Sequence, residues 1–150
     1  MTVRVSGEAA EVARAEAQAV LSMVQDETRR ARLADVVAAV DDGEVGGDDA
    51  DALAELLDLG LTTGRVRALY GPDGEQAAVA LFRRLPLGKE LTDSARELTE
   101  ALGALEGRRI ERVTVNAVGP GEYGVTISTE DFEVVLRLGR AGARLATIGA

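Results

Sequence analysis

The chain has 150 residues and a formal net charge of −9; 46% of its residues are hydrophobic and 29% are charged, but only 3% are aromatic. This composition is typical of a globular protein with an aliphatic core rather than of a disordered chain. The absence of His, Cys and Trp excludes a disulfide framework, a thiolate nucleophile and an ordinary zinc site.

The negative charge is concentrated near the beginning of the chain. Residues 1–60 carry 14 acidic and 5 basic side chains, whereas residues 108–150 carry 5 and 6. Because nucleic acids and anionic membranes attract clustered positive charge, we expect neither as a partner. We find no signal-peptide pattern and no apolar run near the ~20 residues of a membrane span. Arg outnumbers Lys sixteen to one, which indicates a GC-rich gene. Together these features predict a soluble, cytoplasmic, bacterial protein.

The first 42 residues predict a short strand and two helices. Thr2–Ser6 alternates like an edge strand, and Ser6 is placed to cap the next helix. One apolar stripe then comprises Ala13, Ala17, Val20, Leu21 and Val24. A second stripe comprises Leu33, Val36, Val37 and Val40. At ~100° per residue the two stripes point in nearly opposite directions, which favours a turn near 25–29. The alternative is one long helix that meets different partners at its two ends.

Further helices are expected after a loop at Asp41–Gly47. Asp48 or Asp49 would cap a third helix that ends at Gly60, and Thr63 would cap a short fourth helix with Val66, Leu69 and Tyr70 inward. A turn at Gly71–Gly74 and a fifth helix ended by Pro86 follow. A sixth helix, capped by Thr92 or Ser94 and ended by Gly107, carries an apolar stripe of Leu91, Ala95, Leu98, Leu102 and Leu105.

After Gly107 the pattern changes to short alternating runs separated by turn residues. Their short connections predict four strands paired as antiparallel hairpins, with one apolar face covered by the last helix. The expected fold is therefore a single α+β domain over residues 1–150. Its helical part, with five to six helices, occupies about 7–106, and its antiparallel sheet about 108–149.

Two segments match part of a ligand-loop pattern. Gly119–Gly124 has the spacing G-x-G-x-x-G, but a strand follows where dinucleotide binding needs a helix, so we interpret it as a hairpin turn. An acidic segment starting at Asp42 partly fits an EF-hand loop, but Leu53 occupies the position of the bidentate ligand. We interpret this segment as an acidic interhelical loop and expect no metal site.

One basic segment is a candidate anion site. Its helices are short, so a phosphate or carboxylate would meet several converging side chains there: Thr63, Arg65, Arg67, Arg83 and Arg84, with Lys89 nearby. The alternative is that these cations pair with the acidic N-terminal helices.

With no His base and no recognisable catalytic constellation, we expect no enzyme and no cofactor. The sequence favours a non-enzymatic protein-interaction or self-assembly module. Its interface would pair either sheet edges or the helix stripe that contains Val20 and Val24. The alternative is a small-ligand or anion-binding domain that uses the Arg65–Lys89 region. An enzyme based on carboxylates, Arg and Tyr would need a buried carboxylate with a raised pKa.

Overall fold

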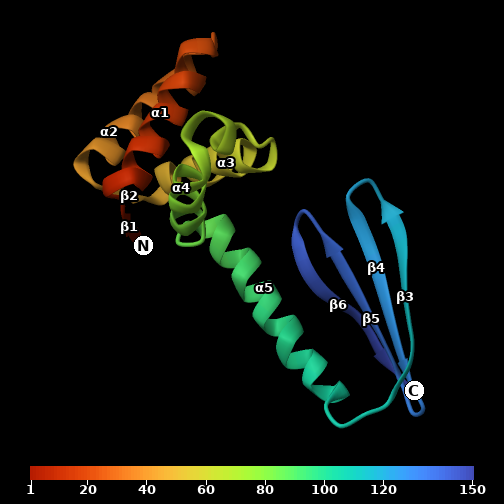
Figure 1. Cartoon of the computed structure of the whole chain (residues 1–150). Coiled ribbons are helices and arrows are strands. Elements are labelled where there is room, and N and C mark those ends of the chain that lie inside the picture. The colour runs from red at the N-terminus through yellow and green to blue at the C-terminus, as the bar shows by residue number, and fades with distance from the viewer. The chain divides into compact units, whose positions relative to one another are not determined.

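The computed structural model describes all residues, 1–150, and the chain divides into two compact units, Met1–Lys89 and Glu90–Ala150. Helices precede a four-stranded antiparallel sheet, and a two-stranded sheet involves the N-terminus, which confirms the α+β class (Figure 1). Each unit has its own cluster of buried apolar residues. The prediction that residues 1–150 act as one domain stays a prediction. No helix combines the length and the apolar character needed to cross a bilayer.

The first unit contains β1 (Thr2–Arg4), α1 (Gly7–Met23), α2 (Glu27–Asp42), β2 (Glu44–Gly46), α3 (Gly47–Thr62) and α4 (Arg65–Phe82). The N-terminal strand was expected, and it pairs antiparallel with β2, so that buried Val3 lies opposite buried Val45. The prediction of Asp41–Gly47 as a loop was wrong, because β2 lies within it. β2 contains a single apolar residue, Val45, between Glu44 and Gly46, so the sequence shows no alternation there.

The prediction of two N-terminal helices is confirmed. α1 ends at Met23 and α2 begins at Glu27, and the side chain of Asp26 accepts a 2.7 Å hydrogen bond from the backbone N–H of Arg29, as an N-cap residue does. Ser6 occupies the N-cap position of α1, but its side chain makes no capping hydrogen bond.

Three predicted boundaries around α3 were wrong. The helix begins at Gly47 and Gly46 occupies its N-cap position, so neither Asp48 nor Asp49 caps it. Gly60 does not end the helix but lies buried within it, because the neighbouring helices approach closely there. A Cβ at Gly60 would lie 2.8 Å from Cγ2 of Val66 and 3.0 Å from Oε2 of Glu16. Thr63 does not cap α4; its hydroxyl donates a 2.7 Å hydrogen bond to the carbonyl of Leu59 at the end of α3.

The fourth and fifth predicted helices correspond to the two helical segments of α4, which are separated at Gly71 as expected. Gly71 interrupts α4 with φ 72° and ψ −176°, a conformation that favours glycine, and Pro72 follows. Leu69, predicted to point inward, is 62% exposed.

The helix predicted last begins earlier than expected. Pro86 starts α5 (Pro86–Leu102) rather than ending a helix, because the first turn of a helix needs no donor from proline. Thr92 and Ser94 therefore lie inside α5, where the hydroxyl of Ser94 donates to the carbonyl of Leu91 at 2.9 Å. The structure thus has five α-helices, within the expected range of five to six.

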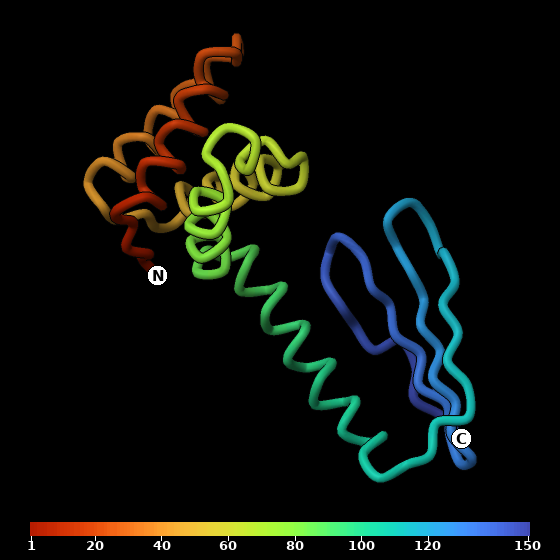
Figure 2. Tube along the Cα trace, in the orientation of Figure 1, coloured from red at the N-terminus to blue at the C-terminus, as the bar shows by residue number.

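The second unit contains most of α5, a 3-10 turn at Gly103–Leu105 and four strands. The strands are β3 (Ile110–Gly119), β4 (Glu122–Thr129), β5 (Glu133–Gly139) and β6 (Gly142–Gly149). They pair in sequence order and antiparallel, and the trace reverses at each short connection (Figure 2). This confirms the predicted meander.

The strand register aligns three cross-strand rows of apolar residues on one face of this sheet. The rows are Val113–Ile127–Val134–Ile148, Val115–Val125–Leu136–Leu145 and Ala117–Tyr123–Leu138–Ala143. Leu98 of α5 packs with Val134 and Leu136, and all three are buried. The last helix therefore covers the middle of the apolar face, as expected, while Val113 and Val115 on β3 remain 53% and 65% exposed.

The close approach of Val66 and Glu16 to Gly60 predicts that a larger residue at this position destabilises the protein. Replacement of Gly60 by Ala should lower the free energy of unfolding by about 1–3 kcal/mol, because the new methyl group overlaps Val66 and Glu16. Gly103→Ala is the matched control, since a Cβ there meets nothing within 4 Å. Urea unfolding followed by circular dichroism measures both; equal stability of the two variants would contradict the packing described for α3.

Candidate functional site

A buried carboxylate links two helices of the first unit, α1 and α4. Glu16 on α1 is only 1% exposed. Its Oε2 accepts hydrogen bonds from Nη2 and Nε of Arg65, at 2.6 and 3.2 Å, and its Oε1 accepts one from the Tyr70 hydroxyl at 3.0 Å. Both carboxylate oxygens therefore have partners, which offsets the cost of removing the charge from water.

The local sequence explains how these three groups meet. Glu16 stands between Ala13 and Ala17 on the apolar stripe of α1, and both alanines are fully buried, so the carboxylate enters the helix interface. Arg65 is the first residue of α4, and Gly60 on α3 leaves room beside the carboxylate. Partial burial raises the pKa of the Tyr70 hydroxyl, and the hydrogen bond to Glu16 and the charge of Glu16 raise it further, while Arg65 opposes them.

Most of the basic residues predicted to bind an anion have separate partners in the structure. Arg65 is bound to Glu16, Arg67 lies 3.5 Å from Glu75, and Nη1 of Arg84 donates to the backbone carbonyl of Arg4 at 2.9 Å. Nζ of Lys89 lies 2.8 Å from the sulfur of Met1, and Arg83 is exposed. The structure therefore shows no shared ligand point for these cations, and anion binding by this set stays a prediction.

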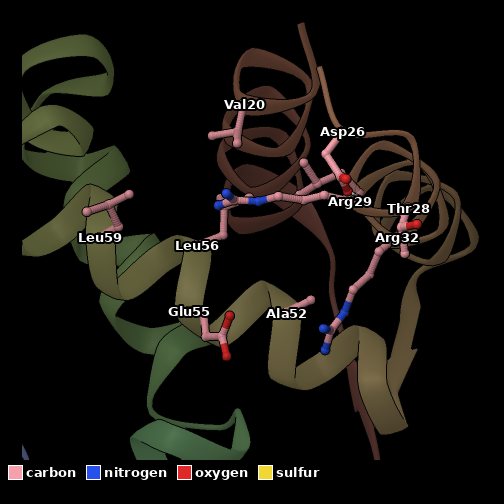
Figure 3. Close-up of a pocket in the computed structure, with 10 residues that line it drawn as sticks. Val20, Asp26, Thr28, Arg29, Arg32, Ala52, Glu55, Leu56 and Leu59 are labelled. Carbon is pink, nitrogen blue, oxygen red and sulfur yellow. Dashed lines mark hydrogen bonds between the residues drawn. The ribbon is translucent and has the colours of Figure 1, made fainter. Parts of the chain in front are cut away.

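A cavity of about 340 Å³ lies between α1, α2 and α3 (Figure 3). We call it the α2–α3 groove. Its apolar wall is formed by Val20, Leu33, Ala52, Leu56 and Leu59. Its polar rim is formed by Asp26, Thr28, Arg29, Arg32 and Glu55. A second cavity, of about 320 Å³, shares Val20, Leu56 and Leu59 with it and reaches Glu16 and Arg65. The apolar surface thus continues from the rim of α2 to the buried ion pair.

The two valines predicted at an interface both pack on the core of this unit. Val20 is half-buried and lines both cavities, while Val24 follows the last turn of α1. The carbonyl of Val24 accepts a 3.4 Å hydrogen bond from Nη1 of Arg30. A charge at Val20 would therefore disturb packing as well as any contact between chains. The helix-stripe interface at Val20 and Val24 stays a prediction.

Three important residues were missed by the sequence reasoning. Glu16 had a usable signal, because it is a charged residue on an otherwise apolar stripe. Arg29 and Arg32 had no such signal in the sequence, because exposed arginine pairs are common on helices. Only the opposite wall of the groove distinguishes this pair from others.

Comparison of the chain with models of known protein families, with curated proteins and with solved structures gave no match. Along residues 1–150, no group of three or more acidic side chains is arranged to hold a metal ion. Arguments about function therefore depend on the geometry of the chain itself.

Glu16, Arg65 and Tyr70 form a group that we call the Glu16 cluster. It predicts that the pKa of the Tyr70 hydroxyl lies above its ordinary value. In a Tyr123→Phe background, Tyr70 is the only tyrosine, and its absorbance change should occur above pH 10, because burial and Glu16 favour the neutral phenol. Adding Glu16→Gln should lower this pKa, since the negative charge is lost while Arg65 remains.

The same shift predicts how stability depends on pH. The folded-state pKa of Tyr70 lies above the unfolded value of 10.0, so its contribution to stability is complete below pH 10 and is lost as the pH rises through the folded value. Tyr70→Phe should therefore lose less stability than wild type above pH 10. An equal loss in both proteins, measured by urea unfolding, would contradict the assignment.

Proposed function

We propose that the protein is a non-enzymatic module that self-associates through the β3 edge of its four-stranded sheet. The observation that carries this proposal is the apolar face of that sheet, which continues beyond α5 onto an exposed edge strand. Val113 and Val115 belong to the same cross-strand rows as buried Val134 and Leu136, yet more than half of each side chain is exposed.

The central part of the β3 edge, residues 113–117, lacks the features that usually prevent strands from pairing with another chain, whereas the charged residues Glu111 and Arg112 and two register shifts lie at the ends of the strand. Proteins protect such edges with charges, proline or bulges. The residues from Val113 to Gly119 include no charged residue and no proline, and the register against β4 is regular from Arg112 to Ala117. On the opposite edge, β6 carries Arg144, and its register shift against β5 falls in the middle of the pairing, between Val135 and Leu136, rather than at the strand ends. The β3 edge is therefore the better surface for strand addition.

A second copy of this chain satisfies the geometry of the β3 edge. Antiparallel pairing of two β3 strands centred on Thr114 places Val113 of each copy opposite Val115 of the other, and both valines lie on the apolar face. This arrangement has twofold symmetry, which is the commonest symmetry of homo-oligomers. It would join two sheets into one with a continuous apolar face and give the edge backbone hydrogen-bond partners.

The Glu16 cluster supports the non-enzymatic part of the proposal. A general base must be within hydrogen-bond reach of the proton it removes. Both oxygens of Glu16 are instead occupied by Arg65 and Tyr70, which is the arrangement of a structural ion pair.

The proposal predicts a dimer that two substitutions dissociate. Light scattering on a size-exclusion column, over a range of protein concentrations, should give twice the chain mass for wild type. Val113→Lys combined with Val115→Lys should give the monomer mass, because like charges would face each other across the paired edge. Both side chains are exposed, so the circular dichroism spectrum should be unchanged.

Leu69→Lys is the matched control, because Leu69 is 62% exposed and lies on α4 in the other unit. This variant should remain a dimer. A wild-type monomer at all concentrations would refute self-association. A dimer that persists in the lysine double variant would place the interface elsewhere.

A further inference from the structure

We propose that the α2–α3 groove binds a small amphipathic carboxylic acid, with its carboxylate on Arg29 and Arg32 and its apolar chain along Val20, Leu56 and Leu59. This site lies in the first unit and is independent of the sheet edge. It also differs from the basic residues that the sequence suggested, since none of those lies on α2.

The apolar part of the ligand would occupy a surface that α1, α2 and α3 leave open. Leu59 is 53% exposed although it lines both cavities, and half-buried Val20 lies beside it. Water in contact with these side chains is displaced by an alkyl chain with a gain of about 25 cal/mol per Å² of apolar surface. The two cavities share three apolar residues, Val20, Leu56 and Leu59, so an alkyl chain that enters the groove meets apolar surface on both sides of them.

Two arginines supply the charge for the carboxylate. Arg29 and Arg32 lie one turn apart on α2, so their side chains emerge on the same face, and both line the groove. Figure 3 shows Arg29 extended from α2 toward Leu56 on α3. Neither guanidinium forms an ion pair; Nη2 of Arg32 has only a 3.5 Å contact with the carbonyl of Asp48. Guanidinium groups bind carboxylates through paired hydrogen bonds.

The acidic side chains of the rim do not occupy the carboxylate-binding position beside the arginines. Asp26 accepts the backbone N–H of Arg29 and so caps α2. Glu55 lies on α3, on the opposite wall from Arg29 and Arg32, and is exposed to solvent. A ligand with a carboxylate at α2 and an apolar body along α3 therefore matches the groove at both ends.

The size of the groove favours a small molecule over a protein segment. A volume of about 340 Å³ falls near the lower end of ordinary ligand pockets, which span roughly 300–1,000 Å³. A docked helix, by contrast, is about 10 Å wide with its side chains and needs a longer surface than one cavity of this volume provides. The occupant that fits is an alkyl carboxylate.

Calorimetric titration of the full chain with octanoate, below its micelle-forming concentration, tests the site. We expect one saturable site per chain, with weaker binding of 1-octanol, which lacks the charge, and of butanoate, which lacks most of the chain. Arg29→Gln combined with Arg32→Gln should weaken octanoate binding by about tenfold or more. Amide shifts in NMR spectra should change at α2 and α3.

Arg83→Gln is the control, because Arg83 is exposed and belongs to the other basic segment; it should bind octanoate like wild type. Leu59→Asp gives a second variant at an exposed position and should abolish binding. The proposal is overturned if octanoate does not bind, if octanol binds equally well, or if the double glutamine variant binds unchanged. A loss of binding in the Arg83 variant would instead assign the site to the basic segment.

Discussion

The helical unit depends on the burial of one charge, the carboxylate of Glu16. A carboxylate that is 1% exposed requires partners for both oxygens, and removal of one partner from such a pair costs about 3–5 kcal/mol. Arg65 supplies one partner from the first residue of α4, and Tyr70 supplies the other from further along the same helix. The ion pair therefore determines where α4 lies against α1. Val20 follows one turn after Glu16 on the same face of α1, so the same rotation of the helix directs Val20 into the groove.

The four-stranded sheet has a different constraint, because its apolar face is wider than the single helix that covers it. Four strands spaced about 4.8 Å apart form a face roughly 14 Å wide, whereas one helix with its side chains is about 10 Å across. A single helix can therefore bury the residues of the central strands but not those of both edges. The exposures follow this expectation: Val134 and Leu136 are buried under Leu98, while Val115 on β3 and Ile148 on β6 are 65% and 48% exposed. Open apolar surface at the sheet edges is thus a consequence of having one covering helix.

The sequence predicted the elements better than it predicted their boundaries. The strands and the break between α1 and α2 were found because hydrophobic periodicity reports which face of an element is buried. Predicted boundaries were wrong where the residue type is suited to more than one position in a helix. Gly60 suggested a helix end, but here its missing side chain permits close packing inside α3. Pro86 suggested a stop, but proline is equally suited to the first turn of a helix.

The candidate sites were harder to predict for a related reason. Arg65 was predicted in an anion site, with pairing to the acidic N-terminal helices as the alternative, and its partner in the structure is Glu16, forty-nine residues earlier in the chain. Arg29 and Arg32 are recognisable as groove residues only when α3 is placed opposite them. That placement depends on contacts between residues far apart in the sequence. Short-range spacing carries no information on such contacts.

The scarcity of aromatic residues restricts how this protein can bind a partner. Strong interfaces commonly concentrate their energy in Trp, Tyr and Arg side chains, but this chain has two Tyr, two Phe and no Trp. Tyr70 is committed to Glu16, and Phe132 packs with Leu98 and Val134 in the core of the second unit. Tyr123 is the one exposed aromatic side chain, at 50%, so most of the affinity must come from aliphatic area, from arginine and from the backbone. Strand addition uses backbone hydrogen bonds as its main source of affinity, and an alkyl carboxylate uses aliphatic area and guanidinium groups. The two proposed surfaces, the β3 edge and the α2–α3 groove, use these sources of affinity.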